Sequence, residues 1–268
     1  MEIWAVAGIR IPPELRRSPS RSGIRTSKRS LSILIGSLSA STASGFLDLS
    51  LLSATIEHGT VTFVSIETVT LTTIDGLSIE ADIITASLDR PVRGGVVIAH
   101  PHPLYGGDRF NPVVDALFRG LAERGFDAIR FDFRGVGRSE GEHDGGESER
   151  LDVAAAIDFL ANLHSEGVWA AGYSFGSMVA LDVIEPRVLG WVAVAPPLSG
   201  PRTVLAARDP RPKLILSPQH DQFCDPNRAA DMTADWINHQ LGIVEGTDHF
   251  LNGRLTAIVE QVDEFLVG

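Results

Sequence analysis

The sequence predicts an α/β protein, with a mostly parallel central sheet, an antiparallel hairpin at its N-terminal side and helices on both faces. Two observations support this prediction. From about Val61 onward, short apolar runs alternate with segments whose apolar residues recur at helical spacing. Most of these runs are continuously apolar, which is typical of parallel strands that helices cover on both faces. With 268 residues, 44% of them hydrophobic, the chain suits one large or two small globular domains.

The elements follow in chain order. Asp75-Gly76 lies between residues 69–72 and 77–83, and this dipeptide favours a tight turn between two antiparallel strands. Apolar strands are then expected at residues 95–99, 128–133, 167–171, 191–195, 213–216 and 243–245. Helices are expected after Asn111-Pro112, which is a typical helix start, at residues 151–163, after residue 174 and at residues 255–266.

Charge and cysteine content limit the classes of partner. Residues 1–58 hold seven of the 23 basic side chains but only four of the 34 acidic ones, so the rest of the chain has a net charge of about −14. This sign disfavours nucleic acid and anionic membranes as partners. No run approaches the roughly 18 apolar residues of a membrane span. The single cysteine, Cys224, excludes an internal disulfide and fits a reducing compartment, so we expect a cytoplasmic protein.

The first 58 residues are expected to be an extension of a folded domain at residues 59–268. Residues 10–30 are rich in Arg and Ser, and an apolar run at 31–38 precedes a stretch of small residues. Three interpretations stay open: a disordered extension, an upstream-extended reading frame, and a targeting peptide that would direct the protein to an organelle or out of the cell.

The sequence GYSFG at residues 172–176 is the most informative short motif. It follows an apolar strand and precedes a segment in which Met178, Val179 and Val183 have helical spacing. A serine on a sharp strand-to-helix turn needs glycines two residues to either side, because neighbouring backbone passes close by. The motif therefore predicts Ser174 as a nucleophile, but five residues of this kind also arise by chance.

A serine hydroxyl is a weak nucleophile, so it needs a base, and the base needs an acid that orients it. Asp221 and His249 each come after a downstream apolar strand. Because sites in parallel sheets form at the carboxyl ends of strands, both are expected near Ser174. Asp225 is the alternative acid, but it precedes Pro226 and is also suited to cap a helix at the surface.

These motifs resemble those of the α/β-hydrolase superfamily over about residues 66–268, and the resemblance implies the α/β-hydrolase fold. In that superfamily the chain order is Ser, then Asp or Glu, then His, as it is here. The segment SPQHDQFCD at 217–225 is similar to the superfamily's acid loop and favours Asp221 over Asp225. The segment GTDHF at 246–250 is similar to its histidine turn.

Two further segments narrow the resemblance. HPHPLYGG at 100–107 and DFRGVGRS at 132–139 resemble a group of small bacterial α/β-hydrolases, distantly similar to dienelactone hydrolases, whose substrates are mostly undefined. Ser174 occupies the position that is cysteine in dienelactone hydrolase itself.

An oxyanion hole is expected beside the serine. One donor should be the N–H of Phe175, and the other an N–H from the loop after residues 95–99. In that loop the prolines have no N–H, so His102 and Leu104 remain, and the H-G-x pattern of the superfamily favours His102. Residues next to these donors are expected to contact the substrate: Leu104, Tyr105 and Tyr173.

His100 and His102 also form an H-x-H pair, which can place two imidazoles near one metal ion. No further cluster supplies a third ligand, so neither a metal nor a cofactor is predicted. Arg134, Arg138 and Glu140 follow a strand and are expected to form structural ion pairs and turns rather than substrate contacts.

The sequence thus predicts a cofactor-independent serine hydrolase acting on a small ester, thioester or related acyl substrate. About seventeen residues separate the strands at 191–195 and 213–216, too few for a large lid domain, so we expect a shallow or open pocket. A peptidase or amide hydrolase with the same three residues, and a non-catalytic binding protein of the same fold, are the alternatives. The oligomeric state stays undecided, and a homodimer is compatible with the sequence.

Overall fold

All strands in the described part of the chain belong to one sheet. The structure is a computed structural model that describes residues 32–35, 51–57, 60–86, 91–198 and 203–268, with side chains described from residue 65. Ser32–Gly268 forms one compact unit. The strand order is β1-β2-β3-β4-β6-β5-β7-β8-β9-β10. The strands are β1 Ser32–Ile35, β2 Leu51–Glu57, β3 Thr60–Thr72, β4 Ser78–Ile84, β5 Gly94–Ala99, β6 Phe126–Phe131, β7 Val168–Tyr173, β8 Val188–Val194, β9 Lys213–Pro218 and β10 His239–Val244.

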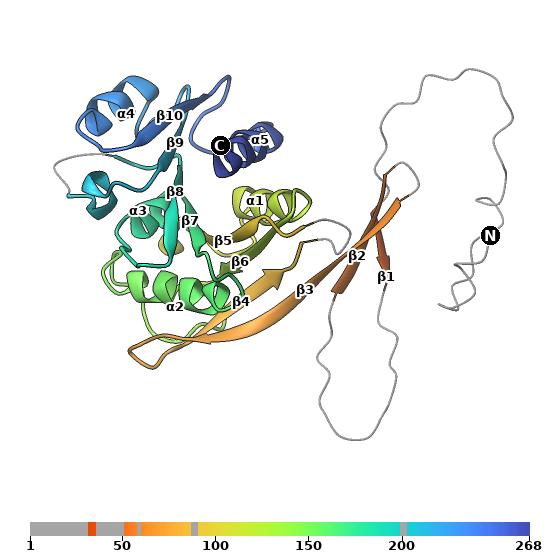
Figure 1. Ribbon diagram of the computed structural model, residues 1–268. Helices are drawn as coiled ribbons and strands as arrows, with labels where there is room; N and C mark the ends of the chain where they lie inside the picture. The colour runs from red at the N-terminus through yellow and green to blue at the C-terminus, as the bar shows by residue number, and fades with distance from the viewer. Residues whose placement is uncertain (1–31, 36–50, 58–59, 87–90, 199–202) are drawn as a thin grey trace, which may run out of the picture. The chain divides into compact units, whose positions relative to one another are not determined.

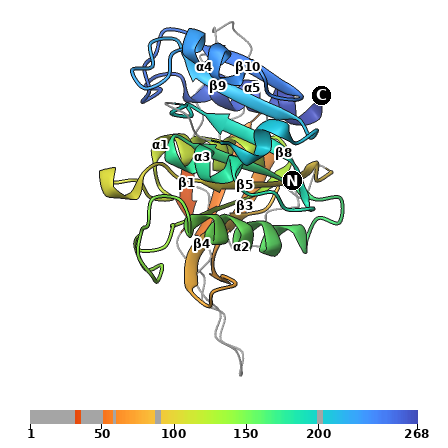
Figure 2. The ribbon, with the colours of Figure 1, turned by 90° about the vertical axis from the view of Figure 1, so that its left-hand side faces the viewer.

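The sheet changes from antiparallel to parallel along its length. β1 to β4 pair antiparallel in sequence order, and β4 joins β6 antiparallel. From β6 to β10 every neighbouring pair is parallel. Figure 2 shows β8, β9 and β10 in succession toward one end of this sheet. The predicted hairpin at Asp75-Gly76 is the β3–β4 turn, so the predicted fold class is confirmed.

Five α-helices and two short 3₁₀ helices connect the described strands. The α-helices are α1 Pro112–Ala122, α2 Glu149–Ala161, α3 Phe175–Leu181, α4 Pro226–Thr233 and α5 Leu255–Val267, and the 3₁₀ helices are η3 Pro103–Tyr105 and η4 Leu205–Arg208. α1 begins as predicted, because the Asn111 side chain accepts a hydrogen bond from the N–H of Val113, 3.0 Å away. α4 was not among the predicted helices, and β6 begins two residues before the predicted strand.

The sheet separates two hydrophobic cores. Consecutive residues of β5 alternate between them: Val96 and Ile98 pack with α1 and α5, and Val97 and Ala99 pack with α2 and α3. Figure 1 shows α1 and α5 on one face of the sheet and α2 and α3 on the other. The continuous apolar runs of the sequence therefore reflect burial on both faces.

The segment before residue 59 is described only in part. β1 and β2 lie within it and extend the antiparallel edge of the sheet beyond β3. Residues 1–31, 36–50 and 58, which include the whole Arg- and Ser-rich segment at 10–30, lie outside the described residues. The three interpretations of this segment remain predictions.

The chain reverses direction across the sheet at β5. β6 lies on one side of β5 and β7 on the other, so the loops that leave the carboxyl ends of β5 and β7 diverge. Ligands of open parallel sheets bind in the crevice that forms at such a reversal. Residues 100–111 follow β5, and Ser174 follows β7, so the two predicted halves of the site meet there.

A buried ion-pair network holds the loop that follows β6. The Arg134 guanidinium lies 2.8 Å from the Asp152 carboxylate, which is fully buried on α2, and 3.0 Å from Asp75 in the hairpin turn. Arg138 pairs with Glu80, and the Glu140 carboxylate accepts a hydrogen bond from the N–H of Ser78. These contacts agree with the structural role predicted for Arg134, Arg138 and Glu140.

Removal of the Asp152 carboxylate should destabilise the protein strongly. In Asp152→Ala the Arg134 charge stays buried with its main partner lost, which costs about 3–5 kcal/mol of unfolding free energy. Asp158→Ala is the matched control on the same helix, because Asp158 pairs with Arg187 at the surface, where such a pair contributes about 1 kcal/mol or less. Urea denaturation of both variants measures the difference, and equal losses would contradict the account.

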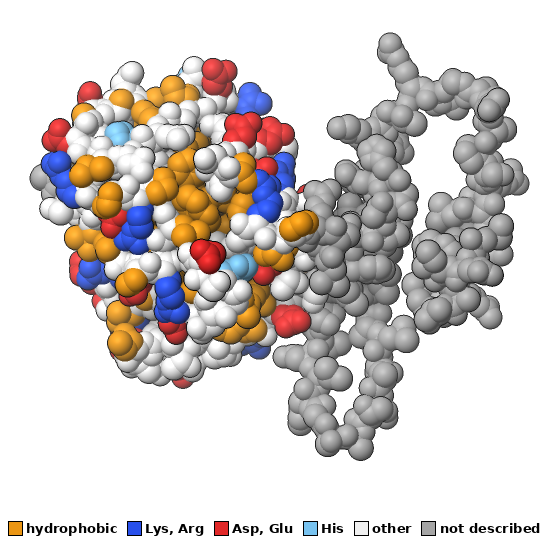
Figure 3. Space-filling view, in the orientation of Figure 1, with side chains coloured by type: hydrophobic (Ala, Val, Ile, Leu, Met, Phe, Trp, Pro, Cys, Tyr) orange, Lys and Arg blue, Asp and Glu red, His pale blue; other side chains and the backbone are white. Residues whose placement is uncertain are grey.

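Figure 3 shows acidic and basic side chains interspersed on the face in view, with hydrophobic side chains gathered near its middle, over β7 and β8. On that face no large area has a single sign of charge. No helix in the described part of the chain is long and apolar enough to cross a membrane.

Candidate active site

Ser174 sits in a strained turn between β7 and α3. Its backbone has φ 52° and ψ −120°, a region that side-chain-bearing residues rarely adopt and that costs on the order of 1–3 kcal/mol. A Cβ atom on Gly172 would lie 2.4 Å from the carbonyl group of Gly176, and one on Gly176 would lie 2.4 Å from the carbonyl oxygen of His100. Both glycines are therefore required by close backbone contact, as the motif predicts.

The structure brings Ser174, His249 and Asp221 into one hydrogen-bonded chain. Ser174 Oγ lies 2.9 Å from His249 Nε2, and His249 Nδ1 lies 2.8 Å from Asp221 Oδ2. The histidine and the aspartate are both buried, with 6% and 5% of their surface exposed. Asp221 Oδ1 accepts hydrogen bonds from the N–H groups of Phe223 and Cys224, so both carboxylate oxygens are engaged and the carboxylate is held in place.

Asp225 has a different role from Asp221. Its carboxylate accepts hydrogen bonds from the N–H groups of Asn227 and Arg228, at 2.9 and 3.1 Å, and so caps the N-terminus of α4. It is exposed, and its carboxylate is engaged with α4 rather than with His249. The geometry therefore favours Asp221 as the partner of the histidine.

Tyr173 helps to hold the loop that carries His249. Its hydroxyl donates a hydrogen bond to the carbonyl oxygen of His249, 3.0 Å away. Burial, together with the negative charges of Asp221 and Asp248, raises the pKa of Tyr173 to about 12, so the hydroxyl keeps its proton and remains a donor. Tyr173 also lines the cavity described below, so it can serve as both a positioning residue and a wall of the site.

His100 is a structural residue, because backbone groups hold both ring nitrogens. Nε2 accepts a hydrogen bond from the N–H of Phe133 at 3.0 Å, and Nδ1 donates to the carbonyl oxygen of Pro101 at 2.6 Å. Burial lowers the pKa of His100 to about 4, so the ring is neutral near pH 7. Neither nitrogen is available to a metal ion, and within the described residues no group of three His, Cys, Asp or Glu side chains has the arrangement of a metal site.

The loop after β5 folds back tightly beside the serine. The His102 carbonyl accepts hydrogen bonds from the N–H groups of Tyr105 and Gly107, and a Cβ on Gly107 would lie 2.1 Å from the Pro101 carbonyl oxygen. The N–H of Leu104 donates to Nδ1 of His102 at 3.3 Å. Leu104 is therefore engaged within the loop, whereas the N–H groups of His102 and Phe175 have no acceptor among the described residues.

A second histidine–carboxylate pair lies behind this loop. His143 Nδ1 is 2.5 Å from Oε1 of Glu149, which is fully buried. The His143 ring packs against the rings of His102 and Phe175, with centroids 4.8 and 5.3 Å apart. Sequence analysis missed this pair, because no motif places a loop histidine against the first turn of α2.

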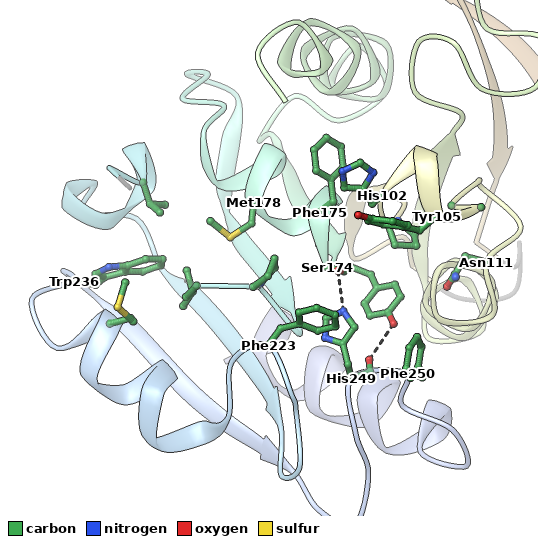
Figure 4. Close-up of a pocket in the computed structure, with 18 residues that line it drawn as sticks. His102, Tyr105, Asn111, Ser174, Phe175, Met178, Phe223, Trp236, His249 and Phe250 are labelled. Atoms are coloured by element: carbon green, nitrogen blue, oxygen red, sulfur yellow. Dashed lines mark hydrogen bonds between the residues drawn. The ribbon is translucent and has the colours of Figure 1, made fainter. Parts of the chain in front are cut away.

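Ser174 lies on the wall of a cavity of about 750 Å³, a size usual for small-molecule sites. Figure 4 shows Met178 and Trp236 on one side of Ser174 and Tyr105 and Asn111 on the other. The lining residues are Pro101, His102, Tyr105, Gly106, Gly107, Asn111, Tyr173, Ser174, Phe175, Met178, Pro197, Leu198, Val204, Phe223, Met232, Trp236, His249 and Phe250. Of the three residues predicted to contact the substrate, Tyr105 and Tyr173 line this cavity, whereas Leu104 is 73% exposed and does not line it.

The cavity is open at one end and deeper than expected at the other. Tyr105 and Phe250 are 87% and 56% exposed, as befits a site without a lid, and the described residues between β8 and β9 contain only η4. Met232 of α4, Trp236 in the turn after α4 and Val204, directly before η4, form this deeper part.

A sheet that is parallel from β6 to β10, with a serine on the strand-to-helix turn after β7, is the arrangement of the α/β-hydrolase fold, and the family follows from the sequence. Residues 96–252, more than half of the chain, match the model of the Alpha/beta hydrolase family. This chain therefore belongs to the alpha/beta hydrolase family.

Related proteins agree with this assignment. The chain is 29% identical over 184 residues to an uncharacterized protein of Rickettsia prowazekii (strain Madrid E), a match covering 64% of this chain and 77% of the relative. An alpha-beta serine hydrolase homologue from Coxiella burnetii has a TM-score of 0.68 at 28% identity, over 75% of this chain and 97% of that chain. A lidless serine hydrolase from Xanthomonas campestris has a TM-score of 0.67 at 25% identity, over 75% and 93%. Family and neighbours together place this protein among the hydrolases.

Gly172→Ala should disrupt the turn that presents Ser174. The added Cβ meets backbone atoms that cannot move independently, so we expect a loss of about 2 kcal/mol or more in stability and of about a hundredfold or more in kcat. In Gly253→Ala, the control, the Cβ meets nothing within 4 Å although φ is +73°, so only about 1 kcal/mol of backbone strain is expected. Thermal unfolding and hydrolysis rates of both variants check this, and full activity of Gly172→Ala would refute it.

His100 should make stability fall at mildly acidic pH. The unfolded chain binds a proton on this ring near pH 6.5, but the folded chain does so only near pH 4. The stabilisation is therefore complete above pH 6.5 and is lost as the pH falls toward 4, with a slope of up to about 1.4 kcal/mol per pH unit. Urea unfolding across this range should show a smaller slope for His100→Gln than for the wild type, and equal slopes would contradict the assignment.

Proposed function

We propose that this protein is a serine hydrolase that cleaves a small ester, thioester or related acyl substrate through an acyl-enzyme. The observation that supports this most strongly is the continuous contact from Ser174 Oγ through His249 to Asp221, on the wall of a cavity large enough for a small molecule. A nucleophile, a base within hydrogen-bond reach and an orienting carboxylate are the groups that acyl transfer requires.

In the first half of the proposed reaction, Ser174 Oγ attacks the substrate carbonyl carbon while His249 Nε2 accepts the hydroxyl proton. Asp221 accepts the hydrogen bond of His249 Nδ1–H, which fixes the tautomer with Nε2 free to act as the base. The carboxylate also stabilises the imidazolium that forms. The tetrahedral intermediate then collapses, the bond to the leaving group breaks, and His249 Nε2–H protonates the departing oxygen or sulfur.

The carbonyl oxygen acquires negative charge in the intermediate and needs donors. The N–H of Phe175, at the first position of α3, and the N–H of His102 are the proposed donors, because both have no acceptor within the described residues. The Leu104 N–H is less suited, since it already donates to the His102 ring. Ring contact between His102 and Phe175, with centroids 4.9 Å apart, holds the two donor segments together.

In the second half, water attacks the acyl-enzyme carbonyl. His249 Nε2 takes the proton from this water and returns it to Ser174 Oγ as the acyl–serine bond breaks, which releases the acid and restores the starting state. No step needs a cofactor.

A fluorophosphonate probe tests the proposal directly. It should label the wild-type protein, should fail to label Ser174→Ala, and should still label Ser78→Ala, a control remote from the cavity. Folded wild-type protein that takes up no probe would favour a non-catalytic binding role. A panel of p-nitrophenyl esters against aminoacyl anilides then separates an esterase from a peptidase, and faster cleavage of the anilides would transfer the proposal to amide substrates.

The two aspartates should differ sharply in a matched test. Asp221→Asn should lower kcat by as much as about ten-thousandfold, because the negative charge that orients His249 and fixes its tautomer is lost. Asp225→Asn removes a helix cap at the surface, worth about 1 kcal/mol, and should leave kcat within a few-fold of wild type. Steady-state kinetics of both variants decides the assignment, and the reverse pattern would transfer the role to Asp225.

A further inference from the structure

The cavity extends well beyond the reacting groups on one side of Ser174. Five apolar side chains from four separate parts of the chain line this extension, here named the apolar arm: Met178, Leu198, Val204, Met232 and Trp236. Met178 lies one turn into α3, directly after the serine, and Met232 and Trp236 come from α4 and the turn that follows it. Figure 4 shows Met178 and Trp236 lying away from His102 and Tyr105, on the opposite side of Ser174.

The apolar arm is sheltered from water and has no charged lining. Met178, Leu198 and Val204 are 4%, 3% and 7% exposed, and Met232 and Trp236, farther from Ser174, are half-buried. None of the described residues that line the whole cavity is Asp, Glu, Lys or Arg. A charged or strongly polar ligand group would lose its hydration in this arm without gaining a partner, whereas a hydrocarbon chain would be stabilised by burial.

Trp236 forms the far wall of the apolar arm, and its backbone is held firmly. Its N–H donates to the carbonyl oxygen of Thr233 at 2.8 Å, and its own carbonyl oxygen lies 3.1 Å from Nδ1 of His239. The next residue, Ile237, donates to the carbonyl oxygen of Ala207 at 2.9 Å, which ties this turn to η4. The wall is therefore anchored from two directions, and it limits the length of a chain that enters the arm.

The other side of Ser174 is open. Tyr105 and Phe250 are largely exposed there, and Asn111 adds a polar side chain. In an acyl-enzyme the alcohol or thiol leaves after the first half-reaction, whereas the acyl group stays on the serine until water attacks. The sheltered arm is therefore suited to the acyl group, and the open side is suited to the alcohol or thiol that leaves.

We infer that the apolar arm is the acyl-chain subsite, and that the substrates are esters or thioesters of apolar acids longer than acetate, with a length limit set by Trp236. This inference rests on the proposed serine hydrolase function. Burial of each methylene in the arm should increase kcat/KM about fourfold until the chain reaches Trp236, and longer chains should be cleaved more slowly.

Two ester series test the inference. In the acyl series the p-nitrophenyl group is constant and the acid runs from acetate through butyrate, hexanoate and octanoate to dodecanoate. In the alcohol series the acid is acetate and the alcohol lengthens through the same range. The wild type should show a clear optimum above acetate in the acyl series and only a weak dependence on length in the alcohol series.

Substitutions in the apolar arm test whether its side chains determine the acyl-chain-length profile. Trp236→Ala should move the acyl optimum to longer chains and increase kcat/KM for dodecanoate about tenfold relative to acetate. Met232→Trp, at a half-buried position on α4, should narrow the arm and move the optimum to shorter chains. Trp169→Ala is the matched control, because Trp169 is also partly buried but lines no part of this cavity. It should leave the chain-length profile unchanged.

The outcomes separate this inference from the proposed function. Hydrolysis by the wild type with a flat acyl profile, or with a profile that Trp236→Ala does not move, would overturn the subsite but leave the hydrolase intact. A shift confined to the alcohol series would assign the arm to the leaving group instead. Failure of the wild type to cleave any ester or to react with a fluorophosphonate would overturn both.

Discussion

The contact between the start of α3 and the end of β5 is the constraint on which the rest of the site depends. Gly176 passes so close to the carbonyl oxygens of Ala99 and His100 that no side chain fits between them. The contact forces the chain to turn sharply at Ser174, whose N–H is tied to β8 through the carbonyl oxygen of Val194. The strained backbone conformation of Ser174 persists because the packing of the surrounding strands prevents the turn from relaxing.

The same contact explains how the parts of the site come together. The loop after β5 begins at the residues that touch Gly176. His102 therefore lies beside Phe175 as a direct result of this contact. His249 and Asp221, the proposed base and acid, come from the loops after β10 and β9, on the other side of the sheet reversal. The Tyr173 hydroxyl donates a hydrogen bond to the His249 carbonyl oxygen, and the Phe223 N–H donates one to the Asp221 carboxylate. These bonds fix the positions of the two loops relative to Ser174. The proposed catalytic groups thus belong to four loops, all of which leave the same edge of the sheet.

How much of this could be predicted from sequence depends on the range of each interaction. The helix caps at Asn111 and Asp225 follow from local rules, because each side chain acts on backbone two or three positions away. The elbow glycines follow from their motif, although Gly176 contacts the backbone at the end of β5, which is distant in sequence. The preference for Asp221 over Asp225 rests on the resemblance of residues 217–225 to the acid loop of the superfamily. Trp236 and the His143–Glu149 pair could not be predicted, since they reach the site from remote parts of the chain and no motif marks them. The extent of the cavity was missed for the same reason. The short β8–β9 connection predicted no large lid domain, and the described residues there contain only η4, but α4 and the turn after it supply a wall of the cavity.

The most direct test of the central claim is the crystal structure of the protein after reaction with an alkyl fluorophosphonate, whose phosphorus imitates the tetrahedral intermediate. The account predicts a covalent bond to Ser174 Oγ, with the phosphonyl oxygen about 2.7–3.1 Å from the backbone nitrogens of Phe175 and His102. It also predicts that the alkyl chain lies in the apolar arm toward Trp236. An adduct on another residue, or a phosphonyl oxygen directed away from both nitrogens, would contradict it.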